Sequence, residues 1–172
     1  MLILAIGDVI GKPGRVTVEK TVPALREEYG IDLVIANAEN IAGGIGVTPD
    51  TAQELLDAGV DVLTSGNHIW AQKAIIPYLD GPMPLLRPLN YPPGVPGRGN
   101  LTIGQVMVVS LIGRVFIDNY DCPFRTMDAL LSAPGRKPPV IIVDFHAEAT
   151  SEKMAMGKYL DGRVSAVLGT HT

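Results

Sequence analysis

Short apolar runs alternate with stretches of helical character along the chain, and this alternation limits the fold more than any other feature of the sequence. We expect strands at residues 2–6, 33–36, 60–64, 106–112, 140–143 and 164–168. We expect helices at residues 15–29, 71–79, 124–132 and 151–159, and one more that Thr48 and Pro49 open and Gly59 ends. Strands that alternate with helices predict an α/β fold with a largely parallel or mixed sheet.

The length and spacing of these elements predict a single domain over residues 1–172. No repeat or linker divides the chain. Residues 81–99 contain six prolines and four glycines, which predicts an ordered loop rather than regular structure. The one cysteine, Cys122, excludes an intrachain disulfide, and we expect it to be a half-buried loop residue.

The formal net charge is −4, so no basic excess favours binding to duplex nucleic acid. The first residues are apolar and run directly into Asp8, which is typical of a core strand rather than a signal peptide. No apolar run approaches the roughly 20 residues that span a bilayer. We therefore expect a cytoplasmic protein without a membrane partner, and the sequence leaves a homo-oligomer open.

Polar side chains follow the last apolar residue of five expected strands. These side chains are Asp8, Glu39, Asn40, Asn67, His68, His146 and His171. In open α/β sheets, ligands bind beyond the carboxyl ends of the strands, so we expect these groups to meet at one edge. A single histidine there is usually structural, but the chain has three histidines and all of them are in this set. The pattern indicates a metal site.

The types of ligand indicate which metals are suitable. Carboxylate, amide oxygen and imidazole without thiolate favour manganese or iron, with zinc a weaker choice. The set is larger than one tetrahedral ion needs. Two ions about 3.5–4 Å apart that share one carboxylate would use all of it, and such pairs serve phosphoryl transfer.

Other nucleotide sites fit the sequence less well. The glycines at positions 7, 11 and 14 have G-x-x-x-G-x-x-G spacing rather than the dinucleotide spacing, and Asp8 would repel a pyrophosphate. We attribute these glycines to tight turns. The sequence also contains neither a Walker lysine followed by serine or threonine nor a G-x-S-x-G elbow.

The ordered motifs resemble the YmdB-like branch of the calcineurin-like metallophosphoesterases. They are Gly-Asp8-Val-Ile-Gly, Asn-Ala-Glu39-Asn40, Gly66-Asn67-His68, Asp-Phe-His146-Ala-Glu-Ala-Thr and Gly169-Thr-His171-Thr. The resemblance covers the whole chain. It implies a four-layered α/β/β/α sandwich and a metal-dependent phosphodiesterase that hydrolyses cyclic nucleotides, in particular 2′,3′-cyclic ones.

The chain departs from the wider pattern at two places. The superfamily opens with Asp-x-His, whereas Val9 and Ile10 follow Asp8 here, and in this branch Asn40 takes the place of that histidine. The family pattern also continues with a further histidine where this chain has its last residue, Thr172. We therefore expect the C-terminal part of the sandwich, with one metal ligand, to be missing.

The resemblance also implies a role for each residue. One ion would be bound by Asp8, Glu39 and Asn40, and the other by Glu39, Asn67, His146 and His171. Glu39 would bridge the two ions, and a hydroxide that bridges them would attack phosphorus. His68, just outside the ligands, would donate a proton to the departing ribose oxygen. The alternative for His68 is a purely structural role.

Several other residues have two interpretations each. Glu148 and Ser151 are expected either to orient His146 or to cap the following helix, and capping is favoured for Ser151. Arg87 and Asn90 are either substrate contacts or loop residues. Trp70 and Tyr91 either stack on a base or pack in the protein, and packing is favoured for Trp70.

Two classes of function remain for this chain. The first is an active phosphodiesterase for a small nucleotide or another phosphodiester. The second is a regulatory module that binds metal and nucleotide with weak turnover or none. The metal content separates them: two ions per chain favour the enzyme, and one or none favours the module.

Overall fold

The computed structural model describes all residues from Met1 to Thr172 and contains two β-sheets. The first sheet has the order β1-β2-β3 and is parallel. The second has the order β4-β5-β6-β7 and is parallel except for the antiparallel β4-β5 pair. The strands are β1 (Ile3–Ile10), β2 (Leu33–Asn40), β3 (Val62–Thr64), β4 (Asn100–Ile103), β5 (Val106–Ile112), β6 (Val140–Ala147) and β7 (Ala166–His171).

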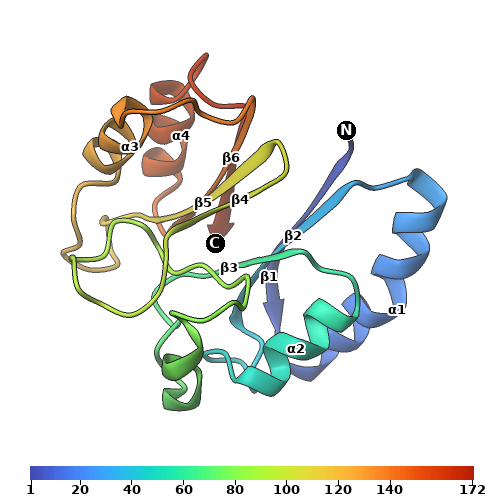
Figure 1. Ribbon diagram of the computed structural model, residues 1–172. Helices are drawn as coiled ribbons and strands as arrows, with labels where there is room; N and C mark the ends of the chain where they lie inside the picture. Colours follow the sequence, from blue (N-terminus) through green and yellow to red (C-terminus); the bar gives the residue numbers. More distant parts are fainter.

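The helices connect these strands and lie on two sides of the molecule, α1 with α2 and α3 with α4 (Figure 1). They are α1 (Gly11–Tyr29), α2 (Pro49–Asp57), α3 (Pro123–Ser132), α4 (Thr150–Tyr159) and the 3₁₀ helix η1 (Lys73–Tyr78). Gly30 ends α1 in the left-handed conformation, with φ 63°, as a C-terminal glycine is expected to do. Thr48 opens α2 through a capping box with Thr51, which confirms the predicted cap.

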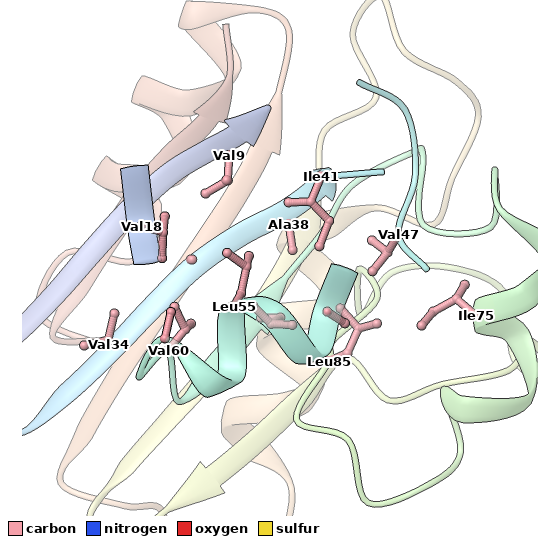
Figure 2. Packing of buried hydrophobic residues seen from close by; sticks show 14 of the residues in the cluster. Val9, Val18, Val34, Ala38, Ile41, Val47, Leu55, Val60, Ile75 and Leu85 are labelled. Atoms are coloured by element: carbon pink, nitrogen blue, oxygen red, sulfur yellow. The ribbon is translucent and has the colours of Figure 1, made fainter. Parts of the chain in front are cut away.

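Three apolar clusters hold these layers together. The largest packs residues of α1 and α2, such as Val18 and Leu55, against residues of the first sheet, such as Val34 (Figure 2). A second packs α3 and α4 against β5 and β6. The third lies between the sheets and consists of Leu33, Ile35, Val62, Leu86, Val106, Val108 and Ile142. Burial of apolar surface therefore fixes each sheet on both of its faces.

The α/β class is as predicted, but five of the six expected strands have different bounds. The expected runs 2–6, 33–36 and 140–143 continue to Ile10, Asn40 and Ala147, and 164–168 becomes Ala166–His171. Most of the polar residues expected just after the strands therefore lie within the strands, near their carboxyl ends, because their backbones still pair with neighbouring strands. Asn67 and His68 follow β3, as expected.

The remaining elements also differ in part from the sequence predictions. β4 was not predicted, the short helix expected at 71–79 is the 3₁₀ helix Lys73–Tyr78, and 60–64 pairs only at Val62–Thr64. Residues 81–99 are irregular apart from isolated bridges at Leu85, Leu86 and Arg98. None of the helices has the length and apolar character needed to cross a membrane.

Candidate metal centre

The alternation of side chains along the central strands creates a polar region between the two sheets. On β2, Leu33 and Ile35 face the second sheet, so Asn37 and Glu39 continue the same face. On β6, Ile142 packs between the sheets, and Asp144 and His146 share its face. The space between the sheets is therefore apolar at the start of these strands and polar at their carboxyl ends.

Three residues from both sheets form the centre of this region. Glu39, His146 and His171 each offer one ligand atom, and these atoms lie within 4.8 Å of one another. Glu39 Oε1 is 3.2 Å from His146 Nε2, and both side chains are fully buried. The His146 and His171 rings have centroids 4.6 Å apart. This spacing suits a shared cation.

Asp8 and Asn67 each have a buried oxygen without a partner. Asp8 Oδ2 accepts a hydrogen bond of 2.8 Å from the backbone N–H of His171, which joins β1 to β7. Asp8 Oδ1, Asn67 Oδ1 and His146 Nε2 are buried and have no hydrogen-bond partner. An unpaired buried polar atom costs roughly 1–3 kcal/mol. The donor set thus fits a bound cation, which would satisfy all three atoms.

His68 contacts two of the proposed ligands. Its Nδ1 lies 2.8 Å from Asn40 Oδ1 and 3.3 Å from Glu39 Oε1, and its backbone N–H donates to Glu39 Oε2 at 3.2 Å. The Asn40 amide also donates to Glu39 Oε1 at 3.2 Å. About one third of the His68 side chain is exposed, at 33%. His68 is therefore held through Nδ1 at the solvent side of the cluster, and its Nε2 has no bonded partner.

The electrostatic surroundings keep Glu39 ionised. Burial by itself raises the pKa of the Glu39 carboxyl, but the close approach of the His146 ring and the contacts with His68 outweigh it, and the pKa is lowered below its usual value. Glu39 therefore presents a buried negative charge to the centre of the site.

The crowding around position 66 explains why a glycine precedes Asn67. A Cβ atom at this position would overlap the imidazole of His146 and the carboxylate of Glu39. Only glycine lets the backbone after β3 approach the cluster so closely.

A buried polar network behind the cluster was not predicted from the sequence. Its members are Asn37, Thr64, Asp144 and Thr170. Burial raises the pKa of Asp144, although hydrogen bonds from Thr64, Thr170 and Asn37 act in the opposite direction. The sequence does contain a signal for this network, because side chains two residues apart on a strand share a face. Asn37 and Asp144 each lie two residues before a candidate ligand, Glu39 and His146.

Two expectations about the segment after His146 are wrong. Glu148 does not orient His146; its Oε2 lies 2.9 Å from Nε2 of His171. Ser151 does not cap α4, because the cap position is Ala149 and no side chain caps it. The helix begins at Thr150, so Ser151 lies inside its first turn.

The other open interpretations concern the loop after η1. Asn90 is buried, and its amide bonds to the backbone of Ile112 and Asp121, so it holds the loop in place. Arg87 donates to the carbonyl of Pro88 at 2.8 Å. The Trp70 ring packs edge to face against Tyr91, with centroids 4.5 Å apart, and Tyr91 packs in the same way against Tyr120, at 4.6 Å. Cys122 is half-buried, as expected.

The fold and this site define an α/β protein with a strand-end cluster of carboxylate, amide and imidazole groups between two sheets. A family model described as YmdB-like protein matches residues 4–172. The chain belongs to this family.

Relatives with names and solved structures agree with this membership. The chain is 45% identical to the 2′,3′-cyclic-nucleotide 2′-phosphodiesterase of Bacillus subtilis, over all of this chain and 67% of that protein. The crystal structure of a hypothetical protein from Thermus thermophilus has a TM-score of 0.92 and 48% identity, covering 100% of this chain and 68% of that one. A novel phosphatase from Mycoplasma pneumoniae has a TM-score of 0.90 and 35% identity, covering 99% and 63%. The chain thus spans about two thirds of their length.

Proposed function

We propose that this chain is a metal-dependent phosphodiesterase with a two-ion centre between the carboxyl ends of its two sheets. One observation carries the proposal: Asp8 Oδ1, Asn67 Oδ1 and His146 Nε2 are buried without partners at the polar ends of the strands that carry Glu39 and His171. Oxygen and imidazole donors without thiolate favour manganese or iron over zinc.

The proposed ligands divide into two sets. Asp8, Glu39 and Asn40 would hold one ion, and Glu39 would share its carboxylate with the second. The second ion would also take Asn67, His146 and His171. When bound, two such ions acidify water and stabilise negative charge on a phosphoryl group. The ionised, buried carboxylate of Glu39 supports its place as the bridge, because it opposes the charge of both cations.

His68 is the proposed general acid. Its Nδ1 is held by Asn40 and Glu39, so the ring has a fixed direction and Nε2 remains for the substrate. In hydrolysis of a cyclic phosphodiester, water adds its oxygen to phosphorus and one phosphorus–oxygen bond to ribose breaks. A proton from Nε2 goes to that ribose oxygen, and a proton given up by the attacking water then replaces it on His68.

The substrate class follows from the relatives and from the charge. The name of the Bacillus subtilis relative supports a 2′,3′-cyclic nucleotide, and the net charge of −4 gives no reason to expect duplex nucleic acid. We further propose that residues 1–172 form one domain, and that its sheets and helices are the inner and outer layers of an α/β/β/α metallophosphoesterase sandwich. Helices on the outer face of each sheet and an apolar cluster between the sheets support this.

The test combines metal content with turnover. The chain is purified without chelator or added metal and analysed for its elements, and hydrolysis of 2′,3′-cyclic AMP is followed with manganese. The Bacillus subtilis relative is the positive control. Glu39→Gln should lose metal and turnover, whereas Asp128→Asn, which alters a carboxylate of α3 bonded to Tyr159 and Arg163, should lose neither.

The outcomes separate the two classes of function. Two manganese or iron ions with turnover support the phosphodiesterase. Bound ions without turnover, while the relative is active, support the regulatory module instead. Stoichiometric zinc with turnover unmoved by manganese contradicts the proposed metals, and a chain that takes up no metal contradicts the whole proposal.

A further inference from the structure

A fully formed hydrogen-bond network lies directly behind His146. Asp144 is 4% exposed and accepts three hydrogen bonds. Its Oδ1 accepts from the hydroxyl of Thr170 at 2.7 Å. Its Oδ2 accepts from the hydroxyl of Thr64 and from the amide of Asn37, the latter at 3.2 Å. Thr170 Oγ1 in turn lies 3.2 Å from His146 Nδ1.

The orientation of Asn37 is fixed from its other end. The backbone N–H of Glu39 donates to Asn37 Oδ1 at 3.2 Å. A backbone N–H only donates, so the Asn37 atom that it contacts must be the amide oxygen. The amide nitrogen must therefore face Asp144 Oδ2. Asp144 Oδ2 is thus committed to Asn37 and Thr64, and Oδ1 is left for Thr170.

Thr170 transmits this arrangement to the imidazole. A hydroxyl has one proton and two lone pairs. The proton goes to Asp144 Oδ1, so Thr170 Oγ1 accepts a hydrogen bond from His146 Nδ1. His146 then has its proton on Nδ1 and a lone pair on the buried Nε2. Glu39 Oε1, 3.2 Å from Nε2, competes for the same proton, so the hydrogen bond to Thr170 must hold that proton on Nδ1.

We propose that Asp144, acting through Thr170, is a positioning residue that holds His146 in the Nδ1–H tautomer and so keeps Nε2 as a metal donor. The part that concerns metal rests on the proposed function. The part that concerns the tautomer rests only on the hydrogen bonds above. Partners of this kind, which bond to the far nitrogen of a ligand histidine, typically change metal affinity by roughly 10–100-fold.

One substitution in the network, Asp144→Asn, should reverse the tautomer of His146. In Asp144→Asn, the amide oxygen must face the Asn37 nitrogen, so the new amide nitrogen faces Thr170. Thr170 then accepts from residue 144 and its proton turns to His146 Nδ1, which moves the histidine proton to Nε2. Thr170→Val, which has nearly the same shape, removes the hydroxyl and leaves Glu39 Oε1 as the acceptor beside the ring, so the proton should move to Nε2. Thr170→Ser keeps the hydroxyl and should restore the wild-type state.

The tautomer is measured without metal or activity. The chain is labelled with ¹⁵N-histidine, treated with chelator and kept above pH 8, where ordinary imidazoles are neutral. Long-range ¹H–¹⁵N correlation reports which ring nitrogen carries the proton. Since the chain has three histidines, substitution of His68 and of His171 assigns the His146 signals. Thr102→Val, at an exposed position of β4, is the matched control.

We expect Nδ1–H in the wild type, Thr170→Ser and Thr102→Val, and Nε2–H in both Asp144→Asn and Thr170→Val. Wild-type His146 with its proton on Nε2 would overturn the proposal, and this result needs no variant to fold. An unchanged tautomer in folded Thr170→Val would overturn it equally.

Manganese affinity of the same proteins separates this proposal from the proposed function. Thr170→Val and Asp144→Asn should bind manganese roughly 10–100-fold more weakly than the wild type, and Thr170→Ser about as well. If the tautomers change as expected but the wild type binds no manganese, the proposed function is wrong while the positioning role of Asp144 stands. If the wild type binds manganese and neither variant binds more weakly, the positioning role has no effect on the metal and that part of the proposal is wrong.

Discussion

Glu39 and Asn40 are neighbours in the chain but differ in their surroundings. Glu39 is fully buried, ionised, and in contact with His68 and His146. Asn40 is half-buried, and its two amide atoms are bonded to His68 and Glu39. The loss of the carboxylate removes a charge that opposes two cations, whereas the loss of the amide removes one neutral donor. The two residues therefore differ in what they contribute to a metal centre.

We predict that Glu39→Gln lowers metal occupancy and phosphodiesterase rate more than Asn40→Ala does. The glutamine keeps the volume but leaves two ions without the shared charge. Asn40→Ala also frees His68, so its rate should fall further than its metal content. Elemental analysis and hydrolysis of 2′,3′-cyclic AMP on both variants test this. Equal losses of metal, or a greater loss in Asn40→Ala, would mean that Glu39 is not the bridge.

Substitution of His68 should affect turnover without affecting metal binding. We predict that His68→Ala keeps its metals and lowers the rate on a cyclic nucleotide by roughly 10²–10⁴-fold, the usual contribution of a positioned acid or base. The loss should be smaller on an aryl phosphodiester with a nitrophenolate leaving group, because that oxygen departs without a proton. His171→Ala is the matched control, since a ligand's removal should empty a metal site and slow both substrates. The same behaviour in His68→Ala would exclude the acid role.

At the scale of the elements, local patterns predicted which elements exist better than where they end. Gly30, Thr48 and the apolar run 106–112 mark ends that depend on local geometry or on unbroken apolar character, and the structure confirms them. β1, β2 and β6 extend further than expected because polar residues continue the ladder, and periodicity of apolar residues cannot show that. β4 was missed because Asn100–Ile103 is short and only partly buried, and its pairing with β5 defines it.

The cap of α2 gives a test at this scale. We predict that Thr48→Ala lowers the free energy of unfolding by about 1 kcal/mol, because it removes the hydroxyl that accepts from the Thr51 N–H. Thr21→Ala, at an exposed position inside α1, should be neutral or slightly stabilising, since alanine is the better helix former. Urea denaturation of both variants measures the difference. A cost for Thr21→Ala that matches Thr48→Ala would show that the cap has no special weight.

At the scale of the whole molecule, the proposed centre joins two sheets that otherwise meet mainly through apolar contacts. Asp8 and Glu39 come from the first sheet, and His146 and His171 from the second. The polar residues of this edge were predicted from the sequence, since each follows an apolar run. Their division between two sheets, and the network around Asp144, depend on contacts between distant segments, and no local pattern encodes those.

Because both sheets supply ligands, metal should stabilise the whole fold. We predict that manganese at about 100 times its dissociation constant stabilises the chain by roughly 2.7 kcal/mol. For a domain of this size, that raises Tm by roughly 5–11 °C. Glu39→Gln should lose this shift.

Leu55→Ala is the control, because it leaves a cavity in the cluster under α2 and should lower the free energy of unfolding by roughly 2–5 kcal/mol. It should nevertheless keep the manganese-dependent shift, because its side chain lies on the opposite face of the first sheet from Glu39. Thermal denaturation with manganese and with chelator measures both effects. A shift that survives in Glu39→Gln would place the stabilising metal away from the junction of the sheets.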